Sequence, residues 1–226
     1  LHRLIRRQRQ MCIRDRYIIA HFLRDKMSWL WGLIDIVNSW LFFFRYGKKL
    51  KLAEVKLDRS SNLLRAYRLR VIPIREVSTI MLVEFFKRQP KEAFKFFKPH
   101  RFDVASIMKL QKNKSFLGYV LVDEYNVAEF QNLGFKGTIV GYCFNRSFFH
   151  GKGFRGRMVD IDYRGRGLGT LMNKILNDVG FSIGLRLFET VNKENMASYK
   201  SAMKASKVIV VKELPNNDLY LEILKN

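Results

Sequence analysis

Three glycines lie within five residues, at Gly165, Gly167 and Gly169. Residues 154–162, before them, predict a β-strand, and residues 171–181, after them, carry apolar side chains at roughly helical spacing. Glycine allows a close approach of backbone to a ligand and adopts positive φ without penalty. The first N–H groups of a helix have no partner within the helix, and the helix dipole adds to their pull on an anion. The turn therefore predicts a binding site suited to a pyrophosphate.

The spacing of the turn separates it from other phosphate-binding loops. A Walker loop needs Gly-Lys-Ser/Thr after a four-residue spacer, and a dinucleotide fingerprint needs glycines at the first, third and sixth positions. Here the spacing is Arg164-x-x-Gly167-x-Gly169, with Arg166 as a second cation at the rim and Val159 five residues upstream of Arg164. This pattern resembles the acetyl-CoA-binding motif of the GNAT superfamily of N-acetyltransferases. A glycine-rich turn that binds no ligand is the alternative.

Composition indicates a packed globular protein with a preference for anionic partners. Hydrophobic residues make up 48% of the 226 residues and aromatic residues 14%, which argues against a disordered chain. The net charge is +22, and half of it falls on residues 1–69. Such a balance favours nucleic acid, phosphorylated metabolites, coenzyme A or an acidic membrane without choosing among them. The two cysteines, Cys12 and Cys143, match no metal spacing, so we expect a reducing compartment, no disulfide framework and no metal.

The first 69 residues divide into three parts. Residues 1–16 resemble a translated sequencing adapter and are excluded from fold reasoning, and residues 1–26 are treated as a doubtful or non-native N-terminus. Residues 28–44 are largely apolar but hold Asp35 and Asn38 at their centre. They predict a helix that packs on the domain, lies at a membrane interface or, at greater cost, spans a bilayer. Residues 49–69 predict a basic linker or an exposed helix.

The order of elements from residue 70 onward predicts a mixed α/β (α+β) fold. We expect a mostly antiparallel sheet of six to seven strands flanked by helices, and this order also resembles the GNAT fold over residues 70–226. The expected strands cover residues 71–75, 115–123, 137–149, 154–162, 185–191, 208–212 and 219–224, and the expected helices cover residues 78–86, 91–97, 103–112, 171–181 and 192–204.

The resemblance implies a cofactor site. In GNAT enzymes the strand before the glycine turn splays from its neighbour and pairs with the pantetheine arm, which places Val159, Asp160 and Ile161 along pantetheine and the thioester. The N–H of Val159 would polarise the acetyl carbonyl. A second family signature is an asparagine that opens the next helix, and here Asn195, Ser198 and Tyr199 fit in residue type. The residues implied to cradle the pyrophosphate are Arg164, Gly165, Arg166, Gly167, Leu168, Gly169, Thr170, Leu171 and Met172.

The catalytic acid and base are less defined by the sequence. Glu189 and then Asp160 are the candidates for the general base, although many relatives work through water and either carboxylate could simply be solvated or ion-paired. Tyr199 is the candidate proton donor, with aromatic packing as its alternative role. His100 and His150 are expected to be solvated rather than catalytic.

The leading interpretation is an acyl-CoA-dependent N-acyltransferase that moves an acetyl group from acetyl-CoA to a primary amine by direct attack in a ternary complex. An amino sugar or nucleotide-linked sugar is the first candidate acceptor. The alternative is a non-catalytic protein that senses acyl-CoA or binds nucleic acid, although no nucleic acid is expected as a partner. We expect a cytoplasmic protein, with peripheral membrane contact through residues 28–51 and a homodimer left open.

Overall fold

The structure is a computed structural model that describes residues 28–59, 69–124 and 137–225. The doubtful N-terminus at residues 1–26 lies outside the described residues, and so do residues 60–68 of the expected linker, whereas residues 49–59 belong to helix α2. Seven strands form one sheet in the order β1-β2-β3-β4-β5-β7-β6. Every neighbouring pair is antiparallel except β4 and β5, which are parallel. The strands are β1 Leu69–Pro73, β2 Phe116–Asp123, β3 Thr138–Ser147, β4 Lys152–Val159, β5 Arg186–Asn192, β6 Lys207–Leu214 and β7 Asp218–Leu224.

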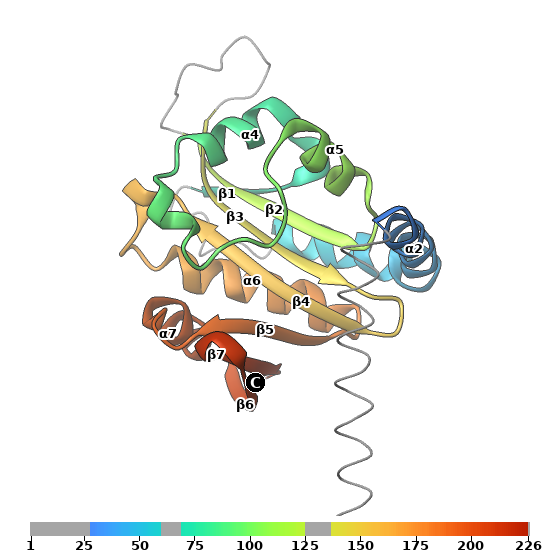
Figure 1. Ribbon diagram of the computed structural model, residues 1–226. Helices are drawn as coiled ribbons and strands as arrows, with labels where there is room; N and C mark the ends of the chain where they lie inside the picture. Colours follow the sequence, from blue (N-terminus) through green and yellow to red (C-terminus); the bar gives the residue numbers. More distant parts are fainter. Residues whose placement is uncertain (1–27, 60–68, 125–136, 226) are drawn as a thin grey trace, which may run out of the picture.

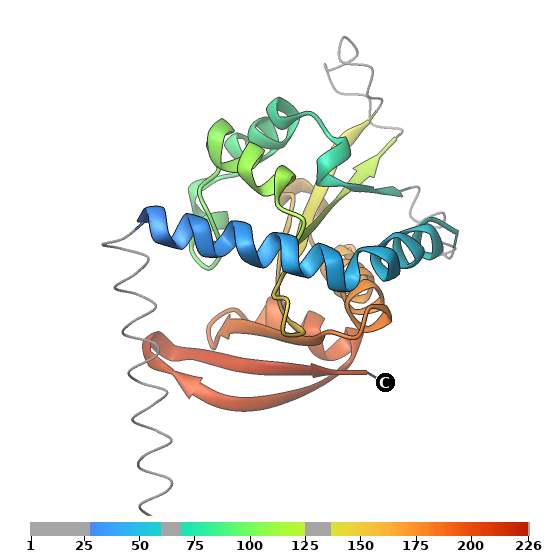
Figure 2. The ribbon, with the colours of Figure 1, turned by 90° about the vertical axis from the view of Figure 1, so that its right-hand side faces the viewer.

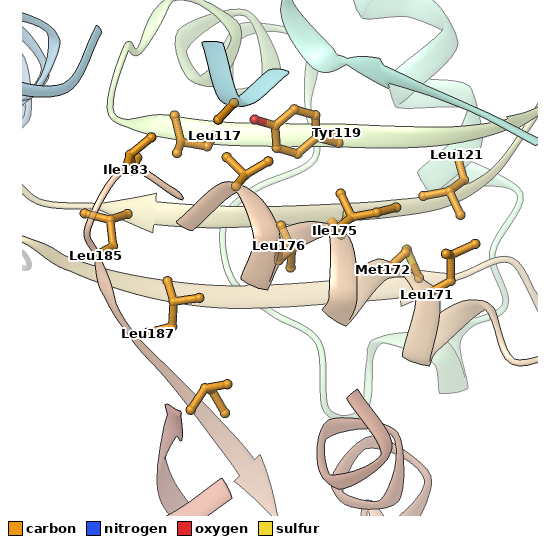
Figure 3. Close-up of a cluster of buried hydrophobic side chains, with 14 of the residues drawn as sticks. Leu117, Tyr119, Leu121, Leu171, Met172, Ile175, Leu176, Ile183, Leu185 and Leu187 are labelled. Carbon is orange, nitrogen blue, oxygen red and sulfur yellow. The ribbon is translucent and has the colours of Figure 1, made fainter. Parts of the chain in front are cut away.

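Helices cover both faces of the sheet (Figure 1). One face of β2 meets α6 through Leu117, Tyr119 and Leu121, and the other packs against α4 and α5. Figure 3 shows the α6 side of this core. Because both faces of β2 are buried, its sequence is almost continuously apolar. The helices are α2 Ser28–Arg59, α4 Thr79–Lys87, α5 Val104–Lys112, α6 Leu168–Ser182 and α7 Met196–Ala205.

The predicted fold class is confirmed, including an edge position for the first strand. The predicted helix at 103–112 forms with Asp103 as its N-cap, whose side chain accepts a hydrogen bond from Ser106 N. The final hairpin turns at Asn216 and Asn217, both at positive φ, which asparagine tolerates better than most residues.

Several boundaries differ from prediction, and three of these differences lie near the site. The strand predicted to reach residue 162 ends at Val159, because the Asp160 side chain accepts a hydrogen bond from Asp162 N and starts a 3₁₀ turn. The helix predicted from residue 192 begins at Met196, where Asn195 caps it. The segment 91–97 forms only a short 3₁₀ turn, Lys91–Phe94.

Helix α2 is longer than predicted and crosses one face of the molecule (Figure 2). Its inward side chains Phe42 and Tyr46 join the core that α6 builds on the sheet, so the helix is part of the same folded unit. Asn38, also inward, donates to Ser115 Oγ at 2.9 Å and to Ser147 O at 3.0 Å and accepts from Phe149 N at 3.0 Å. Among the described residues, no helix is both long and apolar enough for a bilayer crossing.

Asn38→Ala should lower the free energy of unfolding by about 1–3 kcal/mol, because it strands buried polar groups at the ends of β2 and β3. The matched control is Ile36→Ala, which changes an outward side chain that is 54% exposed. It should change the free energy of unfolding by no more than about 0.5 kcal/mol. Urea unfolding followed by circular dichroism measures both. A larger loss from Ile36 than from Asn38 would mean that the helix packs by its other face.

Candidate active site

Strands β4 and β5 part after a short parallel ladder. Their pairing runs from Lys152 with Arg186 to Phe154 with Phe188, while β4 continues to Val159 and β5 to Asn192. On its other edge β4 pairs with β3, and there Phe148 N donates to Lys152 O and Asp160 N to Val140 O. In an antiparallel ladder these bonds recur at every second residue. The even-numbered backbone groups of β4 thus face β3, and those of residues 155, 157 and 159 face the gap beside β5.

The glycine turn stands at the open end of this gap. Gly165 and Gly167 have φ of 77° and 81°, in the left-handed region that glycine adopts most readily. Gly167 is the N-cap of α6 and provides no capping side chain, and the first turn of α6 carries no acidic residue. Residues 164–167 are exposed. The turn therefore presents the helix N-terminus to solvent without a built-in anion, as an anion site requires.

Two hollows meet at the parted strands. The turn-side hollow has a volume of about 590 Å³ and lies between β4, β5, the glycine turn and α7. The loop-side hollow, of about 500 Å³, lies toward the segment 95–99 and the turn at 216–218. The two hollows adjoin between β4 and β5, where they share seven lining residues: Phe96, Phe97, Arg155, Gly156, Glu189, Thr190 and Asn192.

A buried charge cluster lies where the strands part. Glu189 Oε2 accepts from Arg155 Nε at 2.6 Å and from Arg157 Nη1 at 3.0 Å. Burial alone would raise the pKa of Glu189, but the charges of Arg157 and Arg155 outweigh it and lower the pKa. Burial also lowers the pKa of Arg155. Glu189 Oε1 and Arg155 Nη2 lack a hydrogen-bond partner in the described part of the chain.

Arg157 ties this cluster to α7. Its Nη2 donates to Ser198 O, Ser198 Oγ and Ser201 Oγ at 2.7–3.0 Å. Sequence analysis did not single out Arg155, Arg157 or Ser201. The available signal was the alternation Arg155-Gly156-Arg157, which puts both arginines on one face of a strand; nothing local identified Glu189 as their shared partner.

The predicted cofactor residues separate into two groups. Eight of them line the turn-side hollow: Val159, Arg164, Gly165, Gly167, Leu168, Gly169, Thr170 and Asn195. The other five do not. Leu171 and Met172 are buried in the core beneath the turn, Asp160 is buried elsewhere, Ile161 is exposed outside the hollow, and Arg166 lies over the Tyr163 ring at 4.7 Å.

The predicted catalytic residues differ in whether they reach the two hollows. Asp160 accepts from Arg88 Nε at 2.9 Å and from Gln89 Nε2 at 2.8 Å, and it does not line either hollow. Tyr199 packs against the α6 side of the core and lines neither hollow. Glu189 does line both, but its lowered pKa makes it a weak base.

The two histidines differ from one another. His100 is half-buried among aromatic rings and lies 3.0 Å from Tyr142 Oη, so the prediction that it is solvated is wrong. His150 is exposed. Cys143 is fully buried in the sheet, and burial raises the pKa of its thiol. No group of three or more His, Cys, Asp or Glu within residues 28–59, 69–124 and 137–225 could hold a metal ion.

Comparison with solved structures identifies the architecture. The GNAT domain of S. lividans PAT superposes with a TM-score of 0.55 and 16% identity, over 69% of this chain and 89% of that one. The chain has the GNAT fold. A ribosomal-protein-S5-alanine acetyltransferase from Vibrio fischeri shares the GNAT fold with a TM-score of 0.53 and 15% identity, over 68% of this chain and 90% of that one. No protein-family model and no curated protein sequence matches the chain.

Glu189→Gln should lower the free energy of unfolding at neutral pH by about 3–5 kcal/mol, because it leaves two buried arginines without their counter-charge. The pKa of Glu189 in the folded protein lies below its ordinary value of 4.5. Its contribution is therefore complete above that pH and is lost as the pH falls through the lower folded pKa. Urea titrations of both proteins over a range of pH should show the difference shrinking in acid.

The control is Glu194→Gln, which removes an exposed partner of Lys95 and should change stability by about 0–1 kcal/mol. A difference between wild type and Glu189→Gln that is independent of pH would contradict an ionised Glu189.

Proposed function

We propose that the chain is an N-acyltransferase that moves an acetyl group from acetyl-CoA to a primary amine. The observation that carries the proposal is the gap between β4 and β5, which ends at an uncapped, glycine-lined helix N-terminus. A ligand with a polar, extended arm and a diphosphate fits such a site, since the exposed strand edge pairs with the arm and the helix N-terminus takes the diphosphate.

In this proposal different parts of the turn-side hollow bind different parts of acetyl-CoA. Backbone groups from Gly165 to Thr170 hold the pyrophosphate, with Arg164 beside them. Residues 157 and 159 of β4 pair with pantetheine. The N–H of Val159 donates to the thioester oxygen as negative charge develops on it, a contact of a kind worth about 3–4 kcal/mol in other acyl-transfer sites. The net positive charge of the Arg155–Glu189–Arg157 cluster adds to the attraction for an anionic ligand.

The acceptor binds in the loop-side hollow. It meets the thioester where the two hollows adjoin, between β4 and β5. Its amine nitrogen attacks the carbonyl carbon, a C–N bond forms, the C–S bond breaks, and coenzyme A leaves as the thiol. The amine proton passes through water to the departing thiolate, which becomes the thiol. We assign no deprotonation to Glu189, because two arginines hold it ionised as a weak base.

The loop-side hollow supports a phosphorylated or nucleotide-linked amino sugar as the acceptor. Lys95, Lys98 and Arg146 line it, and they suit a phosphate. Asn192 and Asp218, which also line it, suit sugar hydroxyls. Three cations in its lining disfavour a polyamine.

Gly167→Asp should weaken acetyl-CoA binding by at least about a hundredfold, because it places a carboxylate at the N-terminus that holds the diphosphate. Isothermal titration calorimetry of the purified full chain measures this. Gly184→Asp is the matched control: like Gly167, Gly184 has positive φ, 89°, and its Cβ position is open, but it follows the far end of α6. Equal loss in both variants would indicate general damage, and unchanged binding in Gly167→Asp would refute the pyrophosphate site.

A screen of primary amines by thiol release should give turnover with a phosphorylated amino sugar and little with spermidine. Lys98→Gln should raise the KM of the phosphorylated acceptor by about three- to tenfold and leave its kcat nearly unchanged, since the charge binds a remote group. Lys174→Gln, on the outer side of α6, should change neither. A chain that neither binds acetyl-CoA nor releases thiol with any amine, and binds DNA with a steep salt dependence, would overturn the enzyme proposal.

A further inference from the structure

The first half of helix α2 has its polar side chains turned inward. Asp35 accepts from Arg146 Nη2 at 3.3 Å, Asn38 makes the three bonds described above, and Ser39 Oγ accepts from Lys114 N at 2.8 Å. Asn38 and Ser39 are 8% exposed. A surface helix normally places its apolar stripe on the core and its polar stripe in water. Here Asp35, Asn38 and Ser39 face the domain, and the apolar side chain Phe42 is the next inward residue after them.

The opposite side of the same segment is apolar and exposed. Phe44 is 77% exposed and Trp29 is 69% exposed, and seven more large side chains on this side are 40–54% exposed. At about 1.5 Å per residue, the segment from 29 to 44 presents an apolar stripe about 24 Å long. We name these residues the outer stripe of α2: Trp29, Leu33, Ile34, Ile36, Val37, Trp40, Leu41, Phe43 and Phe44. Figure 2 shows this part of the helix crossing the front of the molecule.

Cations border the outer stripe, and exposed carboxylates do not. Lys114 Nζ lies 3.5 Å from the centroid of the Trp40 ring and 4.1 Å from that of Phe43, and Lys109 Nζ lies 3.9 Å from the Cβ position of Gly32. Arg45, Lys48 and Lys49 continue the helix beyond Phe44. Within residues 28–53 the sole acid is Asp35, which is paired with Arg146, and residues 104–119 contain none.

We propose that the outer stripe of α2 docks the protein on the surface of an anionic lipid bilayer. An apolar face bordered by cations and rich in Trp and Phe is the pattern of a helix that lies in the interface plane. Aromatic side chains then sit at the headgroup level, and the lysines meet anionic headgroups. The helix lies on the bilayer and does not cross it, because its inward polar side chains remain bonded to the domain.

A second copy of the chain is a poorer occupant. A two-fold interface places the same patch on both sides, so Lys109, Lys114 and Arg45 of one copy would meet those of the other. Neither stripe offers a carboxylate to offset that repulsion. An anionic bilayer supplies the missing charge.

The test uses the full chain with vesicles of phosphatidylcholine alone and of phosphatidylcholine mixed with phosphatidylglycerol. All three tryptophans of the chain lie in this helix, at positions 29, 31 and 40, so tryptophan emission reports on it directly. We expect co-sedimentation with the mixed vesicles and a blue shift of the emission. Val37→Ser/Phe44→Ser should weaken vesicle binding by at least about tenfold, because both side chains would leave the interface.

Ile80→Ser is the matched control, since Ile80 is 55% exposed on α4 and apart from the stripe. It should leave vesicle binding unchanged, and circular dichroism should show that every variant is folded. Vesicle binding that is equal in the wild type and the double variant, with no blue shift, would reflect net charge alone and overturn the proposal. A dimer in sedimentation that the double variant abolishes, without vesicle binding, would also overturn it and assign the stripe to a second copy.

Discussion

The geometry of the candidate site depends on the point at which β4 and β5 stop pairing. The last paired residues are Phe154 and Phe188, and the next residues along the two strands are Arg155 and Glu189, joined by a 2.6 Å ion pair. An ion pair thus joins the two strands immediately beyond the last residues of their hydrogen-bond ladder. The pair fixes the distance between the strands at their point of separation, and beyond it each strand follows its other neighbour, β3 or β7. Both hollows follow from this separation.

The same cluster determines where the glycine turn stands. Arg157, next along the face of β4, reaches from Glu189 to Ser198 and Ser201 at the start of α7. Ser201 in turn lies within 3.7 Å of the Cβ position of Gly169, so α7 packs directly on the first turn of α6. A larger residue at Gly169 would press on this contact. Burying three charged groups is costly, so such a cluster stabilises a fold little more than packed apolar side chains would, although removing one member is strongly destabilising. We infer that the cluster is retained because it joins β4, β5 and α7 in one arrangement, which places the helix N-terminus beside the gap.

Sequence analysis located the turn and the order of elements because both depend on local pattern. Glycine spacing, strand alternation and the apolar period of α6 are properties of short windows. The roles of single carboxylates were not accessible in this way. Asp160 follows the strand directly and looked available to the thioester, yet it accepts hydrogen bonds from Arg88 and Gln89, which follow α4 about 70 residues earlier in the chain. Glu189 was expected to be a candidate base, but two arginines from a strand 32–34 residues earlier hold it ionised. In both cases the surroundings of the carboxylate depend on partners far away in the sequence.

Helix α2 shows a different limit of sequence reasoning. The pattern revealed polar residues inside an apolar run but not which side would meet the domain. The sheet determines which side of α2 faces the domain. β2 begins and β3 ends where α2 crosses, and the backbone groups of Ser147 and Phe149 need hydrogen-bond partners there. Asn38 satisfies these groups, whereas an apolar side chain would leave them buried and unpaired. Once the polar stripe is used in this way, the helix geometry directs the aromatic side chains outward. The exposed apolar surface is therefore a direct consequence of how the strand ends are satisfied.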